Sequence, residues 1–79
     1  MERLFFILNP VAGTGRGAKY FPQLRAVLDA KRVDYGYARS EHPGHAVELT
    51  RQAVAAGEKR IIAVGGDGTV NEVASALYG

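Results

Sequence analysis

The stretch IIAVGGDGTVNE, residues 61–72, decides the fold of this chain. Its first four residues are apolar and stop at two glycines, as a buried parallel strand does where it leaves the sheet. A helix is predicted directly after it, because apolar residues recur at i, i+3, i+4 and i+7, namely Val70, Val73, Ala74 and Leu77. Thr69 and Glu72 form a capping box for its first turn. A strand, a glycine-rich turn and a helix N-terminus together suit an anion such as phosphate.

Two more strand–helix pairs precede this stretch. Apolar residues 4–8 predict a central strand, and the alternating residues 33–38 predict an edge strand. Helices are expected from Ala18 or Phe21 to Lys31, with Pro22 in the first turn, and from His45 to Ala56, with Gly57 as the stop. The residues predicted to face inward are Phe21, Leu24, Val27 and Leu28 in the first helix and Ala46, Leu49 and Ala53 in the second.

This order predicts an α/β fold, a three-layer, Rossmann-like βαβαβα unit. Right-handed crossovers give a parallel sheet with strand order 2-1-3. The loops that follow the three strands then share one rim, where ligands of open α/β sheets bind. A sheet of three strands also has exposed edges, through which self-association is expected.

Composition describes an ordinary globular chain. The 79 residues suffice for one small domain or part of one, with 47% hydrophobic residues and 23% charged residues. A net charge of +2 is too small to indicate nucleic acid as a partner, and the absence of cysteine excludes disulfides and thiolate metal sites. The longest apolar run, Leu4–Leu8, is too short for a signal peptide or a membrane span, so we expect a cytoplasmic protein.

The glycine-rich turn has a structural and a functional interpretation. The glycines could serve turn geometry alone, and Thr69 and Glu72 could only cap a helix. Three glycines around one aspartate exceed what a helix start needs, however, which favours a phosphate loop. Asp67 would repel phosphate unless a metal ion lies between them or its carboxylate holds the loop. Both roles for Asp67 stay open.

The first loop offers a rival interpretation. Residues 13–18, GTGRGA, fit the dinucleotide pattern G-x-G-x-x-[GA], with Glu41 downstream as a ribose partner. Asn9 and Pro10 delay these glycines past the strand end, which weakens that pattern. His42 and His45 are interpreted as loop and helix-cap residues rather than as metal ligands.

Two motifs carry a resemblance to a known family. Residues 9–13, NPVAG, followed by residues 65–73, GGDGTVNEV, resemble the start of the diacylglycerol kinase catalytic domain family, which includes bacterial lipid kinases, sphingosine kinases and ceramide kinases. The GGDGT core is shared with NAD kinases, but Asn71-Glu72 after it and Asn9-Pro10 before it favour the lipid kinases. A second nucleotide enzyme class and a non-catalytic nucleotide-binding module remain the alternatives.

The resemblance implies an ATP-dependent, magnesium-requiring kinase that phosphorylates a lipid hydroxyl, such as that of diacylglycerol, with peripheral membrane contact. It assigns no metal ligand within this chain. Asp67 is the candidate catalytic residue, in the metal-linked or loop-holding role that its charge allows. The residues that the resemblance assigns to ATP are Asn9, Pro10, Gly13, Ser40, Gly65, Gly66, Asp67, Gly68, Thr69, Asn71 and Glu72. Two positions depart from the family, since Ala12 replaces serine and Ser40 replaces threonine.

Family members carry a second, β-rich domain that supplies the magnesium ligands and the general base. The resemblance therefore identifies residues 1–79 as the N-terminal ATP-binding part of a two-domain lipid kinase. We expect such a segment to bind nucleotide weakly and to catalyse little, because phosphoryl transfer depends on positioning and on charge neutralisation by metal.

Overall fold

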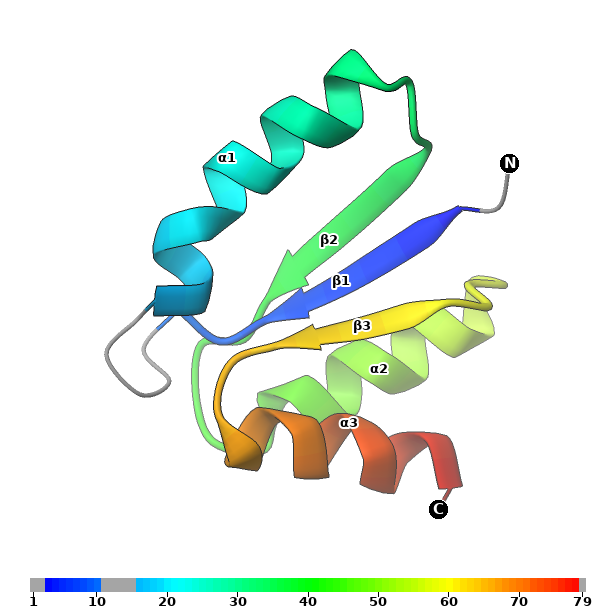
Figure 1. The fold of residues 1–79 in the computed structure, drawn as a ribbon. Coiled ribbons are helices and arrows are strands. Elements are labelled where there is room, and N and C mark those ends of the chain that lie inside the picture. The colour runs from blue at the N-terminus through cyan, green and yellow to red at the C-terminus, as the bar shows by residue number, and fades with distance from the viewer. Residues whose placement is uncertain (1–2, 11–15, 79) are drawn as a thin grey trace.

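Residues 3–10 and 16–78 are described by the computed structural model of the chain (Figure 1). The elements alternate as predicted: β1 (Leu4–Leu8), α1 (Arg16–Ala30), β2 (Tyr35–Arg39), α2 (His45–Ala55), β3 (Ile61–Val64) and α3 (Asp67–Tyr78). Both strand pairs are parallel, and the sheet order is β2-β1-β3. The predicted fold class and strand order are therefore confirmed. None of the helices described is long and apolar enough to cross a bilayer.

The helices form two layers around the sheet. Helix α1 covers one face, and α2 and α3 lie side by side on the other (Figure 1). This division follows from strand order, because the connections β1–α1–β2 and β2–α2–β3 run in opposite directions across the sheet, and right-handed crossovers then place their helices on opposite faces. β1 is central and alternates between the layers, with Phe6 and Leu8 packed toward α1 and Ile7 toward the other two helices.

The α1 layer is aromatic. The Phe21 ring packs edge-on against the rings of Phe6 and Tyr37, with ring centroids 5.4 Å and 5.1 Å apart. Leu28 completes the buried cluster. Leu24 and Val27 were predicted to face inward, but they are 38% and 49% exposed because only the flank that carries Phe21 and Leu28 faces the sheet.

Helix α1 also begins earlier than predicted. It starts at Arg16, so Pro22 lies in the second turn rather than the first. Proline has no N–H to donate, and the helix loses one backbone hydrogen bond at this position. Pro22 is exposed, so water can donate a hydrogen bond to the carbonyl that lacks a partner in the helix.

The α2–α3 layer is built from small side chains. Ala46 and Ala53 are buried on α2 as predicted, and Ile7 of β1 and Val73 of α3 pack with Ala46. Thr50 is fully buried, and its hydroxyl donates to the carbonyl of Ala46 at 2.7 Å. These short residues let α2 and α3 lie close together beneath β1 and β3.

The inward stripe of α3 is offset by one residue from the prediction. Thr69 and Val73 are buried, whereas Val70 and Leu77 are 50% and 48% exposed. The polar Thr69 takes the buried position that the apolar pattern assigned to Val70. This difference lies in the first turn of α3, directly after β3.

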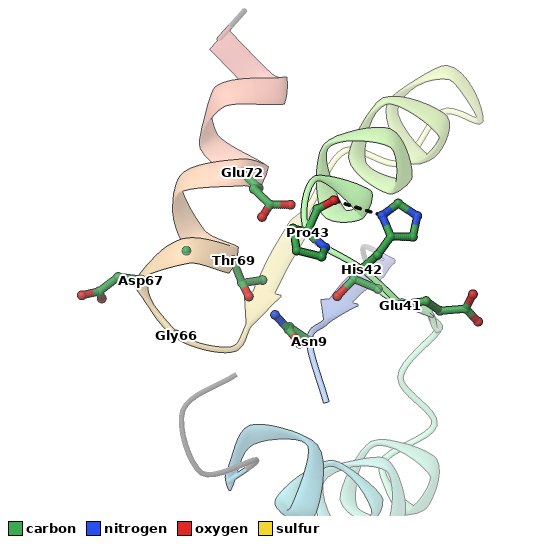
Figure 2. A pocket seen from close by; sticks show the side chains of 10 residues that line it. Asn9, Glu41, His42, Pro43, Gly66, Asp67, Thr69 and Glu72 are labelled. Atoms are coloured by element: carbon green, nitrogen blue, oxygen red, sulfur yellow. Dashed lines mark hydrogen bonds between the residues drawn. The ribbon is translucent and has the colours of Figure 1, made fainter. Parts of the chain in front are cut away.

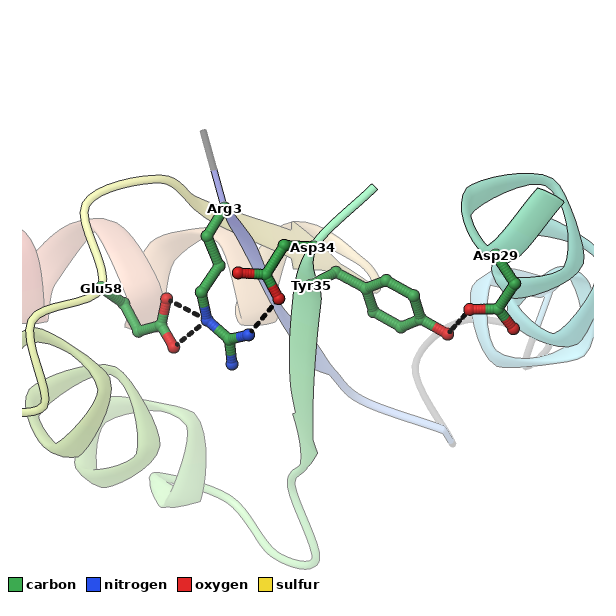
Figure 3. A network of polar contacts seen from close by, with 5 residues as sticks. All are labelled: Arg3, Asp29, Asp34, Tyr35 and Glu58. Carbon is green, nitrogen blue, oxygen red and sulfur yellow. Dashed lines mark hydrogen bonds and ion pairs between the residues drawn. The ribbon is translucent and has the colours of Figure 1, made fainter. Parts of the chain in front are cut away.

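The amino ends of the strands are tied by ion pairs. Arg3 donates from Nε to Glu58 at 2.9 Å and from Nη1 to Asp34 at 2.8 Å (Figure 3). Hydrogen bonding to Glu58, with a further contribution from Asp34, raises the pKa of the Arg3 guanidinium above its ordinary value. Nearby, the Tyr35 hydroxyl donates to Asp29 of α1 at 3.0 Å (Figure 3).

Candidate functional site

A cleft of about 540 Å³ lies at the carboxyl ends of the strands. Residues that follow all three strands line it, as the shared rim predicts: Asn9, Ser40, Glu41, His42, Pro43, Gly66, Asp67, Gly68, Thr69 and Glu72 (Figure 2). Its volume falls within the range of roughly 300–1,000 Å³ that is usual for small-molecule sites. Its position outside the carboxyl edge of a parallel sheet is where open α/β folds bind ligands.

The first turn of α3 forms one wall of the cleft. The helix starts at Asp67, and Gly66 takes the capping position because its carbonyl accepts the first helical bond from the Val70 N–H at 3.2 Å. The predicted capping box of Thr69 and Glu72 is therefore wrong, since the helix is capped three residues earlier, at Gly66. The N–H groups of the first helical turn have no partner within the helix and carry the positive end of its dipole.

The Thr69 side chain is the buried polar group at this wall that lacks a partner among the described residues. It is only 2% exposed, and its Oγ1 is buried without a hydrogen-bond partner among the described residues. A buried hydroxyl left unsatisfied costs about 1–3 kcal/mol, so native structures seldom keep one without a reason. A ligand oxygen in the cleft would supply the missing partner.

Carboxylates dominate the charged groups around the cleft. Glu41, Asp67 and Glu72 line it, and its described lining includes no lysine or arginine. Within the described residues the Asp67 carboxylate makes no hydrogen bond or ion pair, and Figure 2 shows it pointing away from Thr69 and Glu72. Among these same residues, no three acidic or histidine side chains converge closely enough to hold a metal ion.

The opposite wall is the loop after β2. Its first residue, the buried Ser40, extends the β1–β2 pairing through a bond from its N–H to the Leu8 carbonyl at 2.7 Å. On the other side of β1, the Asn9 N–H donates to the Val64 carbonyl at 2.9 Å. These bonds prolong the sheet into the cleft, so its floor and both walls are anchored to the strands.

Most of the predicted ATP residues meet at this cleft. Seven of them line it: Asn9, Ser40, Gly66, Asp67, Gly68, Thr69 and Glu72. Pro10 lies beside an adjoining hollow with Arg39, whereas Gly65 and Asn71 are exposed and do not line the cleft. Gly13 lies outside the described residues, as do most of the glycines of the dinucleotide pattern.

Sequence reasoning missed two lining residues and named a third only in its rival interpretation. His42 and Pro43 were not predicted as contacts, and Glu41 was considered only as a ribose partner in the rival pattern. The signal was available, because all three follow Ser40 in the loop at the carboxyl end of the second strand. In a doubly wound fold that loop belongs to the ligand rim.

Comparison with known proteins agrees with this geometry. Residues 3–79 match the family described as "Diacylglycerol kinase catalytic domain". The chain belongs to this family. The match extends over the whole described chain and includes both motifs on which the sequence resemblance rests.

Individual relatives carry lipid kinase names. YtlR, named as a lipid kinase in Bacillus subtilis, is 40% identical over 98% of this chain, and Sphingoid long chain base kinase 5 of Saccharomyces cerevisiae is 33% identical over 98%. A YegS-like protein named as a lipid kinase in Pseudomonas fluorescens is 40% identical over 70%. The aligned region spans only 26%, 11% and 19% of these relatives, respectively.

Proposed function

We propose that this chain is the N-terminal, nucleotide-binding segment of an ATP-dependent lipid kinase, with the phosphates of the nucleotide at the N-terminus of α3. The observation that carries the proposal is the buried Thr69 hydroxyl, which has no partner among the described residues and lies in the first turn of a helix at the strand-end cleft. Helix N-termini favour anions through free N–H groups and the dipole. Family membership supports ATP as the source of that anion.

The residues of this segment would bind and orient the nucleotide. The first-turn N–H groups at Asp67, Gly68 and Thr69 would donate to phosphate oxygens, and the Thr69 hydroxyl would add one more donor. Asn9 and Ser40 would contribute polar contacts from the ends of the other two strands. The bound ATP supplies a transferable phosphoryl group, and alignment of that group is a large part of kinase catalysis.

Magnesium is implied by phosphoryl transfer in general, but the described residues do not form a magnesium site by themselves. Mg²⁺ is commonly held by one or two carboxylates together with substrate phosphates and water. Asp67 is exposed at the cleft and fits a supporting role of that kind. We propose that the remaining ligands and the general base come from a β-rich domain of the whole kinase.

The acceptor would be a lipid hydroxyl. This part of the proposal rests on the names of the relatives, which refer to lipid and sphingoid base kinases, and on the family description. Within the family, diacylglycerol and sphingosine are the two acceptors to test first.

The experiment has two parts. First, ADP is titrated into the ¹⁵N-labelled chain, and chemical-shift changes are expected at the amides of Asn9, Ser40 and residues 66–72. The dissociation constant should be about 1 mM, because one side of the cleft is open. A kinase that contains this segment is then offered diacylglycerol, sphingosine and NAD with labelled ATP. Transfer to a lipid supports the proposal, whereas transfer to NAD alone would overturn it.

A further inference from the structure

The wall of the cleft formed by residues 40–44 is held in an unusual way. Helix α2 begins after Gly44, which has a left-handed φ of 83° and provides no side chain to cap the helix. Helices usually begin with a side-chain oxygen that accepts a hydrogen bond from an N–H of the first turn. Here the first residue of the helix instead accepts a hydrogen bond from the loop that precedes it.

His45, the first residue of α2, reaches back to the wall. Its Nδ1 accepts a hydrogen bond from the Glu41 N–H at 2.8 Å. Its ring also stacks on the His42 ring, with centroids 4.5 Å apart and planes within 13° of parallel. The two contacts fix the two cleft-lining residues Glu41 and His42 from one side chain.

The first contact determines the chemical form of the His45 ring. A nitrogen that accepts from a backbone N–H carries no proton, so this bond requires the tautomer of His45 with its proton on Nε2. The His42 ring has the opposite arrangement, because its Nδ1 lies 3.0 Å from the Pro43 carbonyl, an acceptor only, and must donate (Figure 2).

We propose that His45 is a positioning residue for nucleotide binding, which sets the loop from Ser40 to Gly44 against the first turn of α3. This inference rests on the proposed function. His45 itself does not line the cleft, whereas four consecutive residues of the loop that it holds do, residues 40–43. Without its bond the Glu41 N–H would turn to water, and the wall would be ordered only when nucleotide binds. That ordering would cost affinity.

The test uses three variants at one position. Asparagine presents an oxygen close to where Nδ1 lies, whereas glutamine presents its oxygen one bond farther out and alanine presents none. The dissociation constant for ADP is measured for the unmodified chain and for His45→Asn, His45→Gln and His45→Ala. We expect His45→Ala and His45→Gln to bind ADP about five- to tenfold more weakly, as the loss of one hydrogen bond predicts, and His45→Asn to stay within about twofold.

A matched control separates positioning from a general loss of stability. Ala55→Gly replaces an exposed residue of the last turn of the same helix with a poorer helix former, without touching the loop. It should leave the ADP constant unchanged. Three results would each overturn the proposal. His45→Ala could bind ADP as tightly as the unmodified chain, His45→Asn could bind as weakly as His45→Ala, or Ala55→Gly could weaken ADP binding as much as His45→Ala does.

A second measurement needs no substitution. The ¹⁵N shifts of the His45 ring, recorded at about pH 8 where an ordinary imidazole is neutral, report which nitrogen carries the proton. A proton on Nε2 and a bare Nδ1 that couples to the Glu41 amide are expected, and a proton on Nδ1 would overturn the proposal. If the unmodified chain binds no ADP while the ring has the expected form, it is the proposed function that fails.

Discussion

At the amino ends of the strands Arg3 donates to both Glu58 and Asp34, whereas at the carboxyl ends the Thr69 hydroxyl is buried with no partner among the described residues. The first end satisfies its polar groups within the chain (Figure 3). The second leaves donors unused around an open cleft (Figure 2). Because unsatisfied buried polar groups are costly, the difference supports our proposal that the cleft end binds a ligand, whereas the other end contributes to stability.

Glycines at the two ends follow the same division. In β2, Gly36 lies under the Arg3 guanidinium, where an added Cβ would collide with Nη2, so this glycine makes room for the ion pairs. At the cleft, Gly66 instead caps α3 and lets the helix begin at Asp67, and this places the first-turn N–H groups at the cleft.

The largest expected effect concerns Asp67. In a kinase that contains this chain, Asp67→Ala should lower turnover at least about tenfold, because an exposed carboxylate at a phosphate site makes electrostatic sense when it acts with the metal. Steady-state kinetics and the melting temperature are measured together. Near-normal turnover at an unchanged melting temperature would reduce Asp67 to a residue that only complements the helix dipole.

The next effect separates affinity from stability at Thr69. Thr69→Val keeps the side-chain shape and removes the unpartnered hydroxyl, so the free energy of unfolding should rise by about 1 kcal/mol while the dissociation constant for ADP increases about tenfold. Thermal unfolding and an ADP titration give the two values. A loss of stability with unchanged ADP binding would mean that the hydroxyl has a structural partner.

A pair of glycines compares the two ends directly. Gly44 at the cleft wall and Gly57 at the opposite end of α2 have left-handed φ values of 83° and 96°, and a Cβ on either would meet nothing within 4 Å. Gly44→Ala and Gly57→Ala should therefore each cost about 1–2 kcal/mol of backbone strain. ADP titration should show about threefold weaker binding for Gly44→Ala alone. Equal effects on ADP binding would contradict the division between the two ends.

The smallest effect is expected at the ion pairs. Glu58→Gln should lower the melting temperature by less than either glycine variant, because the Arg3 side chain is 42% exposed and the amide oxygen of glutamine can still accept a hydrogen bond from its Nε. The loss should shrink at high salt, and ADP binding should not change. The pKa of Arg3 is raised in the folded chain, so its contribution to stability is fully present at any pH below the pKa of the unfolded chain. That contribution is lost only at strongly alkaline pH, and stability should therefore not depend on Arg3 titration near neutrality. A change in ADP affinity for Glu58→Gln would link the two ends.

The sequence predicted the architecture well because its strands are distinct. Leu4–Leu8 and Ile61–Val64 are uninterrupted apolar runs, and parallel connections of this length permit few topologies. One of the predictions that failed lies near the site. Thr69 takes a buried position on α3 that an apolar residue would normally hold, so the apolar pattern placed the inward stripe one residue away.

Helix α1 shows a second limit of sequence reasoning. Leu24 and Val27 fit the helical period, but a helix that packs on two strands buries only part of its apolar stripe, and the sequence does not say which part. The predicted start of α1 was also too late, because proline is best tolerated in the first turn and Pro22 was therefore placed there. The role of Asp67 depends on distances between loops, which no local pattern records.

Mapping the amides that shift on addition of ADP to the 79-residue chain tests the central claim most directly. The account predicts saturable shifts at Asn9, Ser40 to His42 and Gly66 to Glu72, at the carboxyl ends of the strands, and none at Arg3, Asp34 or Glu58. Shifts centred on the Arg3 ion pairs, or no saturable shift at the first turn of α3, would contradict it.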